Sequence, residues 1–171
     1  MTIRQIVYTP DPVLRRKAKK VTVFDKDLQT LVEDMIETMR DAPGVGLAAP
    51  QVGVSQRVIV VEYGDEEDEE APKKLWAVIN PEIVEASEEM VEGPEGCLSV
   101  PRIQGDVNRH VKVVVKGSNR FGKPVKLKLS GWVARIFQHE IDHLEGILFT
   151  DKATKLWRLE EVEEEEAADN V

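Results

Sequence analysis

Two of the three histidines in this chain lie four residues apart, in the segment QHEIDHLEG at residues 138–146. On a helix, residues at this spacing share one face, so His139 and His143 could hold one metal ion together. Glu140 follows the first histidine, where its carboxylate could accept a proton from a water on that metal. The pattern favours a metal site over two unrelated structural histidines.

Catalytic metal sites usually have a third protein ligand. One class of metalloproteases places it six residues after the second histidine, but the chain has Phe149 there, which cannot bind a metal. Another class uses a downstream glutamate, and residues 163–166 lie at a suitable distance. The remaining candidate is Cys97, although a lone cysteine is commonly an inert core residue. A Cys/His/His set would suit zinc, ferrous iron or another divalent transition metal.

Two glycine-containing segments add features that a substrate site needs. Cys97 lies in GPEGCLSVP, residues 93–101, where Gly96 would let a substrate backbone approach closely. The segment GVGLAAPQVG, residues 44–53, loosely matches a dinucleotide-binding fingerprint, but a helix rather than a strand precedes it. Gln51 is polar in this apolar segment, and a buried amide needs hydrogen-bond partners. A substrate carbonyl could be one of them.

Hydrophobic periodicity predicts the elements that would position these residues. An amphipathic helix follows Asp25, which is placed to cap it, and a second helix begins near residue 131, after Ser130. Buried or alternating apolar runs predict strands at residues 57–62, 75–80, 110–116 and 124–130. The strand at 75–80 is expected to end at Asn80-Pro81. Hairpin-spaced strands with two separated helices indicate an α+β fold.

Composition describes one globular unit of 171 residues, with 42% hydrophobic and 32% charged residues. A single cysteine, no secretory signal pattern and no membrane-length apolar run predict a cytoplasmic protein without a membrane partner. The formal net charge of −9 is unevenly distributed, because residues 65–70 and 160–171 hold 13 of the 32 acidic residues. The rest of the chain is slightly basic, with 19 acidic and 23 basic residues. We expect no sequence-specific nucleic-acid binding.

Taken together, GVGLAAPQ, EGCLS and QHEIDHLEG resemble, in this order, the three signature motifs of the bacterial peptide deformylases. The resemblance extends from about Ile6 to Phe149. It implies antiparallel sheets packed around a central metal-bearing helix, with an N-terminal amphipathic helix and a C-terminal helical tail. We accordingly divide the chain into a catalytic domain at residues 1–150 and an acidic helical or flexible tail at residues 151–171.

The family removes the N-formyl group from the N-terminal methionine of newly synthesised proteins and releases formate. The resemblance implies one divalent metal ion on Cys97, His139 and His143, with Fe(II) in the cell and zinc, nickel or cobalt as alternatives. Glu140 would take a proton from the metal's water and later deliver it to the departing amine. The implied donors to the oxygen of the tetrahedral intermediate are Gln51 and the backbone N–H of Leu98.

Substrate contacts are implied by the same resemblance. Gly46 and Gly96 would offer backbone groups to the peptide, while Val45 and Ile136 would line the pocket for the methionine side chain. The partner is then an N-formyl-methionyl nascent peptide. Some members dock on the ribosome through a basic C-terminal helix, but this chain ends in acidic residues, so its docking mode is left open.

Two other functions compete with deformylation. One is a zincin-like metallo-endopeptidase that uses His139, His143 and a downstream glutamate. The other is a metal-binding module without enzymatic activity, which would bind the ion but turn over no formyl peptide. The three motifs rank the deformylase first.

Overall fold

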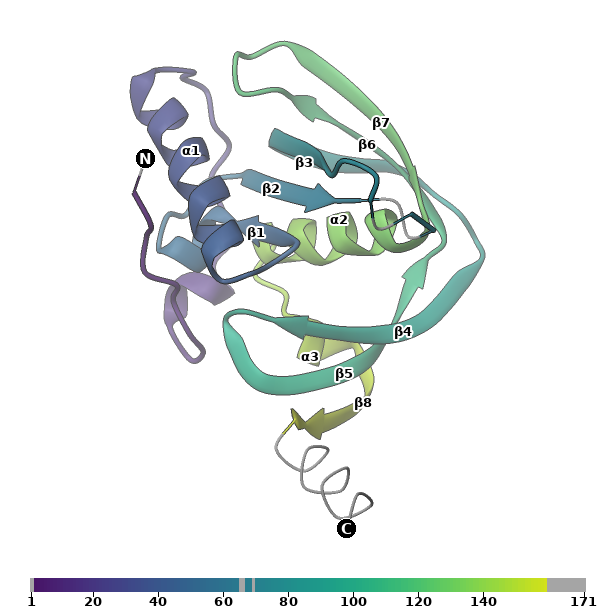
Figure 1. Cartoon of the computed structure of the whole chain (residues 1–171). Helices are drawn as coiled ribbons and strands as arrows, with labels where there is room; N and C mark the ends of the chain where they lie inside the picture. Colours follow the sequence, from purple (N-terminus) through teal and green to yellow (C-terminus); the bar gives the residue numbers. More distant parts are fainter. Residues whose placement is uncertain (1, 65–66, 69, 160–171) are drawn as a thin grey trace.

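The computed structural model describes residues 2–64, 67–68 and 70–159 (Figure 1). Two 3₁₀ turns, three α-helices and eight strands are assigned to these residues. In chain order they are η1 (Pro12–Arg15), α1 (Lys26–Asp41), β1 (Gly46–Ala48), η2 (Ala49–Val52), β2 (Val58–Tyr63), β3 (Lys74–Ala86), β4 (Met90–Cys97), β5 (Val100–His110), β6 (Lys112–Ser118), β7 (Pro124–Ser130), α2 (Gly131–Leu144), α3 (Phe149–Lys152) and β8 (Ala153–Arg158).

The strands form two antiparallel sheets around α2. The larger sheet has the order β1-β2-β3-β6-β7, and the smaller one has the order β4-β5-β8. Helix α2 contacts strands of both sheets, and Figure 1 shows it between them. The α+β fold predicted from the sequence, with antiparallel sheets packed around a central helix, is confirmed.

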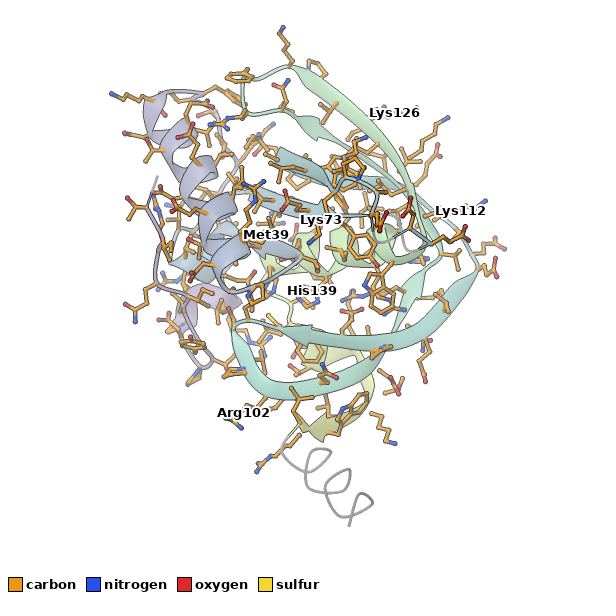
Figure 2. The ribbon with its side chains drawn as sticks, viewed as in Figure 1. Met39, Lys73, Arg102, Lys112, Lys126 and His139 are labelled. Atoms are coloured by element: carbon orange, nitrogen blue, oxygen red, sulfur yellow. The ribbon has the colours of Figure 1, made fainter. Side chains whose placement is uncertain are left out.

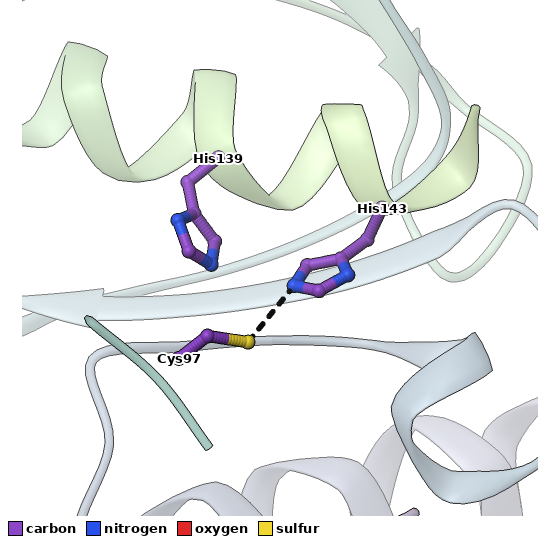
Figure 3. A group of neighbouring side chains, drawn as sticks. All are labelled: Cys97, His139 and His143. Carbon is purple, nitrogen blue, oxygen red and sulfur yellow. Dashed lines mark hydrogen bonds between the residues drawn. The ribbon is translucent and has the colours of Figure 1, made fainter. Parts of the chain in front are cut away.

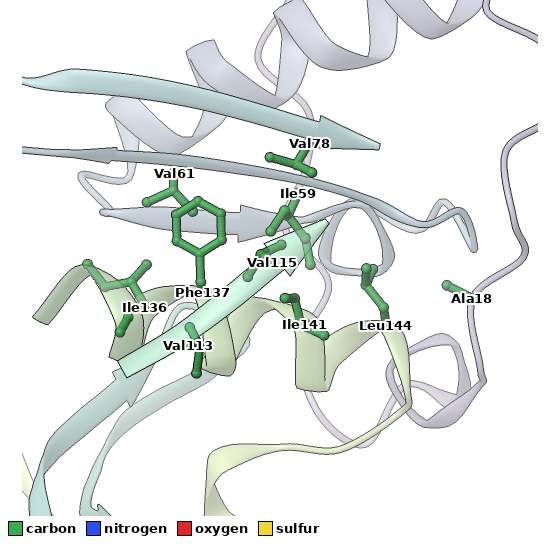
Figure 4. Packing of buried hydrophobic residues seen from close by; sticks show 12 residues of the cluster. Ala18, Ile59, Val61, Val78, Val113, Val115, Ile136, Phe137, Ile141 and Leu144 are labelled. Atoms are coloured by element: carbon green, nitrogen blue, oxygen red, sulfur yellow. The ribbon is translucent and has the colours of Figure 1, made fainter. Parts of the chain in front are cut away.

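Helix α2 is held by its apolar side, which faces the larger sheet. Phe137, Ile141 and Leu144 pack against β-strand side chains such as Ile59 and Val115 (Figure 4). Helical periodicity places these residues on the face opposite to His139 and His143. Ser130 occupies the N-cap position as expected, but its side chain makes no capping hydrogen bond.

Helix α1 covers the other side of the larger sheet at β1 and β2. It starts where predicted, because the Asp25 side chain accepts a hydrogen bond from the Leu28 N–H at 3.0 Å. Its apolar stripe, including Met35 and Met39, is fully buried and confirmed as core. Side chains alternate across β2, so this strand contributes to the cores beneath both helices.

Two sequence expectations need correction. Strand β3 does not end at Asn80-Pro81 but continues to Ala86 through an irregularity. Asn80 adopts a φ of 53° there, and its side chain makes two hydrogen bonds, each 2.8 Å long, to the backbone of Val21. These bonds let the chain bend without ending the strand.

The second correction concerns the C-terminal part of the chain. We expected a helical or flexible tail after residue 150, but Ala153–Arg158 form strand β8, which pairs with β5. This pairing joins the segment to the smaller sheet. The acidic residues 160–171 lie outside the described residues, as do residues 65, 66 and 69 of the acidic run at 65–70. The division of the chain at residue 150 stays a prediction.

No helix among the described residues is long and apolar enough to cross a membrane.

Because α2 lies at the centre of the core, we expect a substitution of Phe137 to lower the stability of the protein strongly. Phe137 is fully buried and lies edge-on to Trp76, with ring centroids 5.6 Å apart. Phe137→Ala should lower the free energy of unfolding by about 3–5 kcal/mol, since it removes a large apolar side chain and leaves a cavity. Urea unfolding of the metal-loaded protein measures this. Phe121→Ala is the control, because Phe121 is 69% exposed, and it should change stability by less than about 0.5 kcal/mol. Equal effects would contradict this prediction.

Candidate metal centre and substrate cleft

Three side chains from two elements converge on one point between α2 and β4. His139 and His143 project from one face of α2, and Cys97 ends β4 (Figure 3). One ligand atom from each of the three lies within 4.8 Å of the other two, and the Cys97 Sγ is 3.3 Å from the His143 Nε2. A thiolate with two imidazoles fits a divalent transition metal. The donor set therefore meets the requirement of a metal site with a further coordination position.

Packing fixes the orientation of both imidazoles. The two rings lie edge to face with centroids 5.0 Å apart, as expected for residues one helical turn apart. Phe149, at the position where one class of metalloproteases has a ligand, instead stacks on His139 with centroids 6.0 Å apart. His143 is 1% exposed. Rings held in this way keep their nitrogens aimed at Cys97.

A buried carboxylate, Glu95, lies directly behind the metal centre. It accepts hydrogen bonds from Arg109 Nε and Nη2, both at 2.9 Å, and from Arg135 Nη1 at 2.7 Å. The fourth bond comes from His139 Nδ1 at 2.9 Å. Because Nδ1–H donates to Glu95, the Nε2 of His139 carries the free lone pair that a metal requires.

Charges around Glu95 balance one another. Burial alone would raise the pKa of Glu95, but the hydrogen bonds from Arg109 and His139 outweigh burial and bring the pKa to about 2. The second carboxylate of this network is Asp142, which lies 2.6 Å from Arg109 Nη1 and 3.0 Å from Lys152 Nζ. Glu95 is therefore ionised at neutral pH and compensated on every side.

Arg135 belongs to this network and also lines the cleft. Its guanidinium donates to the carbonyl oxygens of Val107 at 2.9 Å and Val91 at 2.8 Å, in addition to Glu95. It is 4% exposed and lies 5.4 Å from the Trp132 ring. Its long side chain thus ties α2 to β4 and β5 and fixes the distance between Cys97 and the histidines.

Glu140 lies beside the metal centre and faces β1. It is 4% exposed, and its Oε1 has no hydrogen-bond partner among the described residues. Burial raises the pKa of this carboxyl group to about 7, and the nearby Glu95 adds to the increase, against the opposing effect of His139. Gly46 is essential to this arrangement, because a Cβ at that position would clash with the Glu140 carboxylate. Glu140 is therefore a proton acceptor whose pKa lies near neutral pH.

Gln51 is 2% exposed and its amide is oriented by the surrounding backbone. The Oε1 accepts a hydrogen bond from the Ala48 N–H at 3.0 Å, so the Nε2 must point the other way. The Nε2 lies 3.2 Å from Ser99 Oγ and 3.5 Å from Cys97 Sγ. An amide donor is thereby presented next to the metal centre.

A cleft of ≈ 360 Å³ opens in front of these groups. Nine of the ten residues predicted from the sequence to form the site line it. They are Val45, Gly46, Gln51, Gly96, Cys97, Leu98, Ile136, His139 and Glu140. The tenth, His143, is buried and does not line the cleft, but its Nε2 is 3.3 Å from the Cys97 Sγ. The structure thus brings all ten together from three segments of the chain, residues 45–51, 96–98 and 136–143.

Sequence reasoning missed the network behind the ligands. Glu95 lies in the EGCLS motif, but its spacing indicates no role for it, and nothing in the spacing of Arg109 connects that residue with the metal site. The candidate glutamates of the zincin-like alternative, residues 163–166, lie outside the described residues. Cys97 already lies beside both histidines, so this alternative is not favoured.

The position of Glu95 predicts that Glu95→Gln will lower both stability and metal affinity. The change leaves Arg109 and Arg135 buried without full compensation, which should reduce the free energy of unfolding by about 3–5 kcal/mol. Looser orientation of His139 should weaken metal binding about 10- to 100-fold. The measurements are urea unfolding and competition with a metal chelator.

The stability difference also has a pH dependence. The pKa of Glu95 is lowered on folding from 4.5 to about 2, so its contribution is present above pH 4.5 and disappears as pH falls toward 2. Glu89→Gln, an exposed change in the loop just before β4, is the control and should have little effect. Wild-type stability and metal affinity in Glu95→Gln would contradict the assigned role.

Comparison with known proteins agrees with this site. The family model described as polypeptide deformylase matches residues 3–158. A peptide deformylase of Symbiobacterium thermophilum is 54% identical over 99% of this chain and 76% of its own, and peptide deformylase 1 of Bacillus subtilis is 46% identical over 95% and 97%. The crystal structure of the Thermotoga maritima peptide deformylase is 45% identical, covers 91% of this chain and 100% of its own, and has a TM-score of 0.84. The chain therefore belongs to the polypeptide deformylase family.

Proposed function

We propose that this chain removes the N-formyl group from the N-terminal methionine of newly synthesised proteins and releases formate. The observation that carries the proposal is the convergence of Cys97, His139 and His143 beside the buried carboxylate of Glu140, at the base of a cleft. A solved relative supports the substrate class, since the Acinetobacter baumannii enzyme, 39% identical over 88% of this chain and 98% of its own with a TM-score of 0.82, is described as Met-Ala-Ser bound.

Cys97, His139 and His143 would hold one divalent cation. When bound, this cation lowers the pKa of a coordinated water and polarises the formyl carbonyl. We propose Fe(II) as the ion in the cell, with zinc, nickel and cobalt able to occupy the same ligands. Thiolate and imidazole donors accept all four ions, so the support for a metal comes from the ligand set and the choice of iron from the family resemblance.

Glu140 would move the proton. Its carboxylate takes a proton from the attacking water, and the carbon–nitrogen bond of the formamide then breaks. The same proton goes to the departing amine, which leaves formate and a free N-terminus. A pKa of about 7 suits both steps, because the group can accept and return the proton near neutral pH.

Two donors would stabilise the oxygen on which negative charge develops. The Gln51 Nε2 is held next to Cys97 by the bond from the Ala48 N–H to Oε1, so it is oriented before substrate arrives. The backbone N–H of Leu98, the residue after Cys97, is the second donor. A preorganised donor of this kind contributes about 3–4 kcal/mol to transition-state stabilisation in comparable acyl-transfer sites.

The peptide would bind as an added strand. β1 and β4 are edge strands of the two sheets, and both contribute a glycine to the cleft, Gly46 and Gly96. Unpaired backbone groups at a sheet edge can hydrogen-bond an extended peptide. Ile136 on α2 and the 44% exposed Val45 on the opposite side would receive the methionine side chain.

Formylated nascent peptides are the partners that this reaction requires. We propose that the protein acts in the cytoplasm and meets these peptides where they leave the ribosome.

Deformylation predicts formate release from formyl-Met-Ala-Ser by the metal-loaded protein. Glu140→Gln keeps the size of the side chain but removes the proton acceptor, so the rate should fall about 10²- to 10⁴-fold. Metal content should stay at about one ion per chain, which separates loss of the base from loss of the site. Absence of formate release by the wild type, or an undiminished rate in Glu140→Gln, would refute the proposal. An endopeptidase would instead cleave internal peptide bonds.

The proposed ligands and native metal can be tested together. Protein purified without oxygen should contain iron, and its activity should decay in air while a zinc-loaded sample keeps its own. Cys97→Ser should lose most of its metal, because a hydroxyl is a poorer ligand than a thiolate. His110→Gln is the control, since the third histidine bonds the Ser87 carbonyl oxygen away from the site, and its metal content should match the wild type. Full metal content in Cys97→Ser would rule out ligation by this residue.

A further inference from the structure

Ser99 is fully buried although it lies in a turn. Strands β4 and β5 meet at the pair Cys97 and Val100, so Leu98 and Ser99 form the connection between them. Residues in such turns are normally exposed to solvent. Here the N-terminal segment covers the turn, since the Thr9 N–H donates to the Ser99 carbonyl oxygen at 3.0 Å. Figure 1 shows this segment, in purple, beside the end of the hairpin.

The same segment also holds Gln51. The Val7 N–H donates to the Gln51 carbonyl oxygen at 2.7 Å, two residues before the bond to Ser99. One short stretch of chain therefore ties η2 to the end of the β4–β5 hairpin. Arg102 of β5, labelled in Figure 2, marks this end, while His139, also labelled, lies on α2 further into the molecule.

The side chains of Gln51 and Ser99 meet beside the metal centre. Ser99 Oγ accepts a hydrogen bond from Gln51 Nε2 at 3.2 Å, and both residues are buried. At the other end of the amide, the Ala48 N–H donates to Oε1 at 3.0 Å. The two N–H bonds of an amide lie in one plane at a fixed angle, so an acceptor on one of them sets the direction of the other. The second N–H is therefore directed toward Cys97, whose Sγ is 3.5 Å from Nε2.

We propose that Ser99 is a positioning residue for deformylation, which aims the second N–H of Gln51 at the oxygen on which negative charge develops. The inference rests on the proposed function, because that function makes Gln51 a donor to this oxygen. Without the Ser99 hydroxyl, the amide could keep its bond to Ala48 and still turn about its last side-chain bond. A donor that must be reoriented during the reaction stabilises the transition state less than one that is already in place.

The turn that carries Ser99 also carries the second proposed donor, the backbone N–H of Leu98. Because Thr9 binds the Ser99 carbonyl oxygen, the turn cannot shift without breaking a backbone hydrogen bond. The Ser99 side chain extends this anchor to Gln51. The two donors, which come from distant segments, thereby keep one spacing.

Satisfying a buried amide accounts for only part of this contact. A buried N–H needs an acceptor, and the Ser99 hydroxyl supplies one. The Cys97 sulfur lies within reach of the same nitrogen, however, and as a thiolate it is a stronger, charged acceptor. Ser99 keeps one N–H away from that sulfur. This leaves more of the thiolate's electron density for a metal and limits Gln51 to a single N–H on this side.

Steady-state kinetics with formyl-Met-Ala-Ser and the metal-loaded full chain test this role. Ser99→Ala removes one neutral hydrogen bond and should lower kcat about 3- to 10-fold. KM should change less than about two-fold, because the contact acts on a group that binds the transition state. Metal content should stay at about one ion per chain. Ser87→Ala is the control, since the Ser87 hydroxyl donates to the Glu89 carbonyl oxygen outside the cleft, and its kcat should match the wild type.

A second comparison separates positioning from a structural role. In a Gln51→Ala background, Ser99→Ala should cause no further fall in kcat, because the amide that it aims is gone. A structural role predicts the same fall in both backgrounds. Equal falls in both, or a wild-type kcat in Ser99→Ala, would overturn the proposal.

A third measurement does not depend on turnover. In the zinc-loaded protein, the NMR order parameter of the Gln51 side-chain amide should fall in Ser99→Ala and stay unchanged in Ser87→Ala. An equally rigid amide in Ser99→Ala would also overturn the proposal. Formate release by the wild type tests the proposed function separately, so an active wild type with independent effects of Ser99 and Gln51 refutes only the positioning role.

Discussion

The buried carboxylate of Glu95 is the interaction on which the site depends. One residue binds two guanidinium groups and a histidine, and through them it joins β4, β5 and α2. Such a charge is costly to bury, so every partner must be present for it to be tolerated. The same bonds that satisfy Glu95 set the tautomer of His139 and hold Cys97 opposite it. Stability of the sheet packing and readiness of the ligands are therefore properties of one network.

A second constraint is the close approach of β1 to α2. A side chain at position 46 would occupy the space that Glu140 needs, so a glycine is required for steric reasons there. The absence of a side chain also leaves the backbone of an edge strand open to the cleft. One small residue thus serves both the burial of the proton acceptor and the binding of an extended peptide.

Charge is distributed differently inside and outside the molecule. Around the metal centre, Arg109 and Arg135 are matched by Glu95 and Asp142, so the interior holds no uncompensated group among them. On the outer side of the larger sheet, the lysines of β6 and β7 are exposed to water, and Lys116 has Glu82 of β3 directly opposite it. An exposed charge costs little in water, so only the interior charges need closely placed partners.

Local sequence patterns determined much of this protein. The four-residue spacing of His139 and His143 places them on one helix face whatever surrounds the helix, and the apolar stripe after Asp25 specifies α1 for the same reason. Both of these inferences depend on neighbours along the chain, where helical geometry alone fixes the distances. Cys97 is different, because its spacing left a downstream glutamate open as the third ligand, and only the resemblance of the three motifs to a known family selected the cysteine.

Only the tertiary structure decided the remainder. Arg109 reaches Glu95 because β4 and β5 pair and because α2 packs across them, which no spacing in the sequence reports. Ala153–Arg158 became a strand since the edge of β5 was free to pair, an outcome set by a partner about 50 residues away. Likewise, β3 passes Asn80-Pro81 because the Asn80 side chain bonds the distant Val21 backbone. Most of the free energy of contacts between distant segments comes from the burial of side chains and the pairing of strands. Both exist only once the chain is folded.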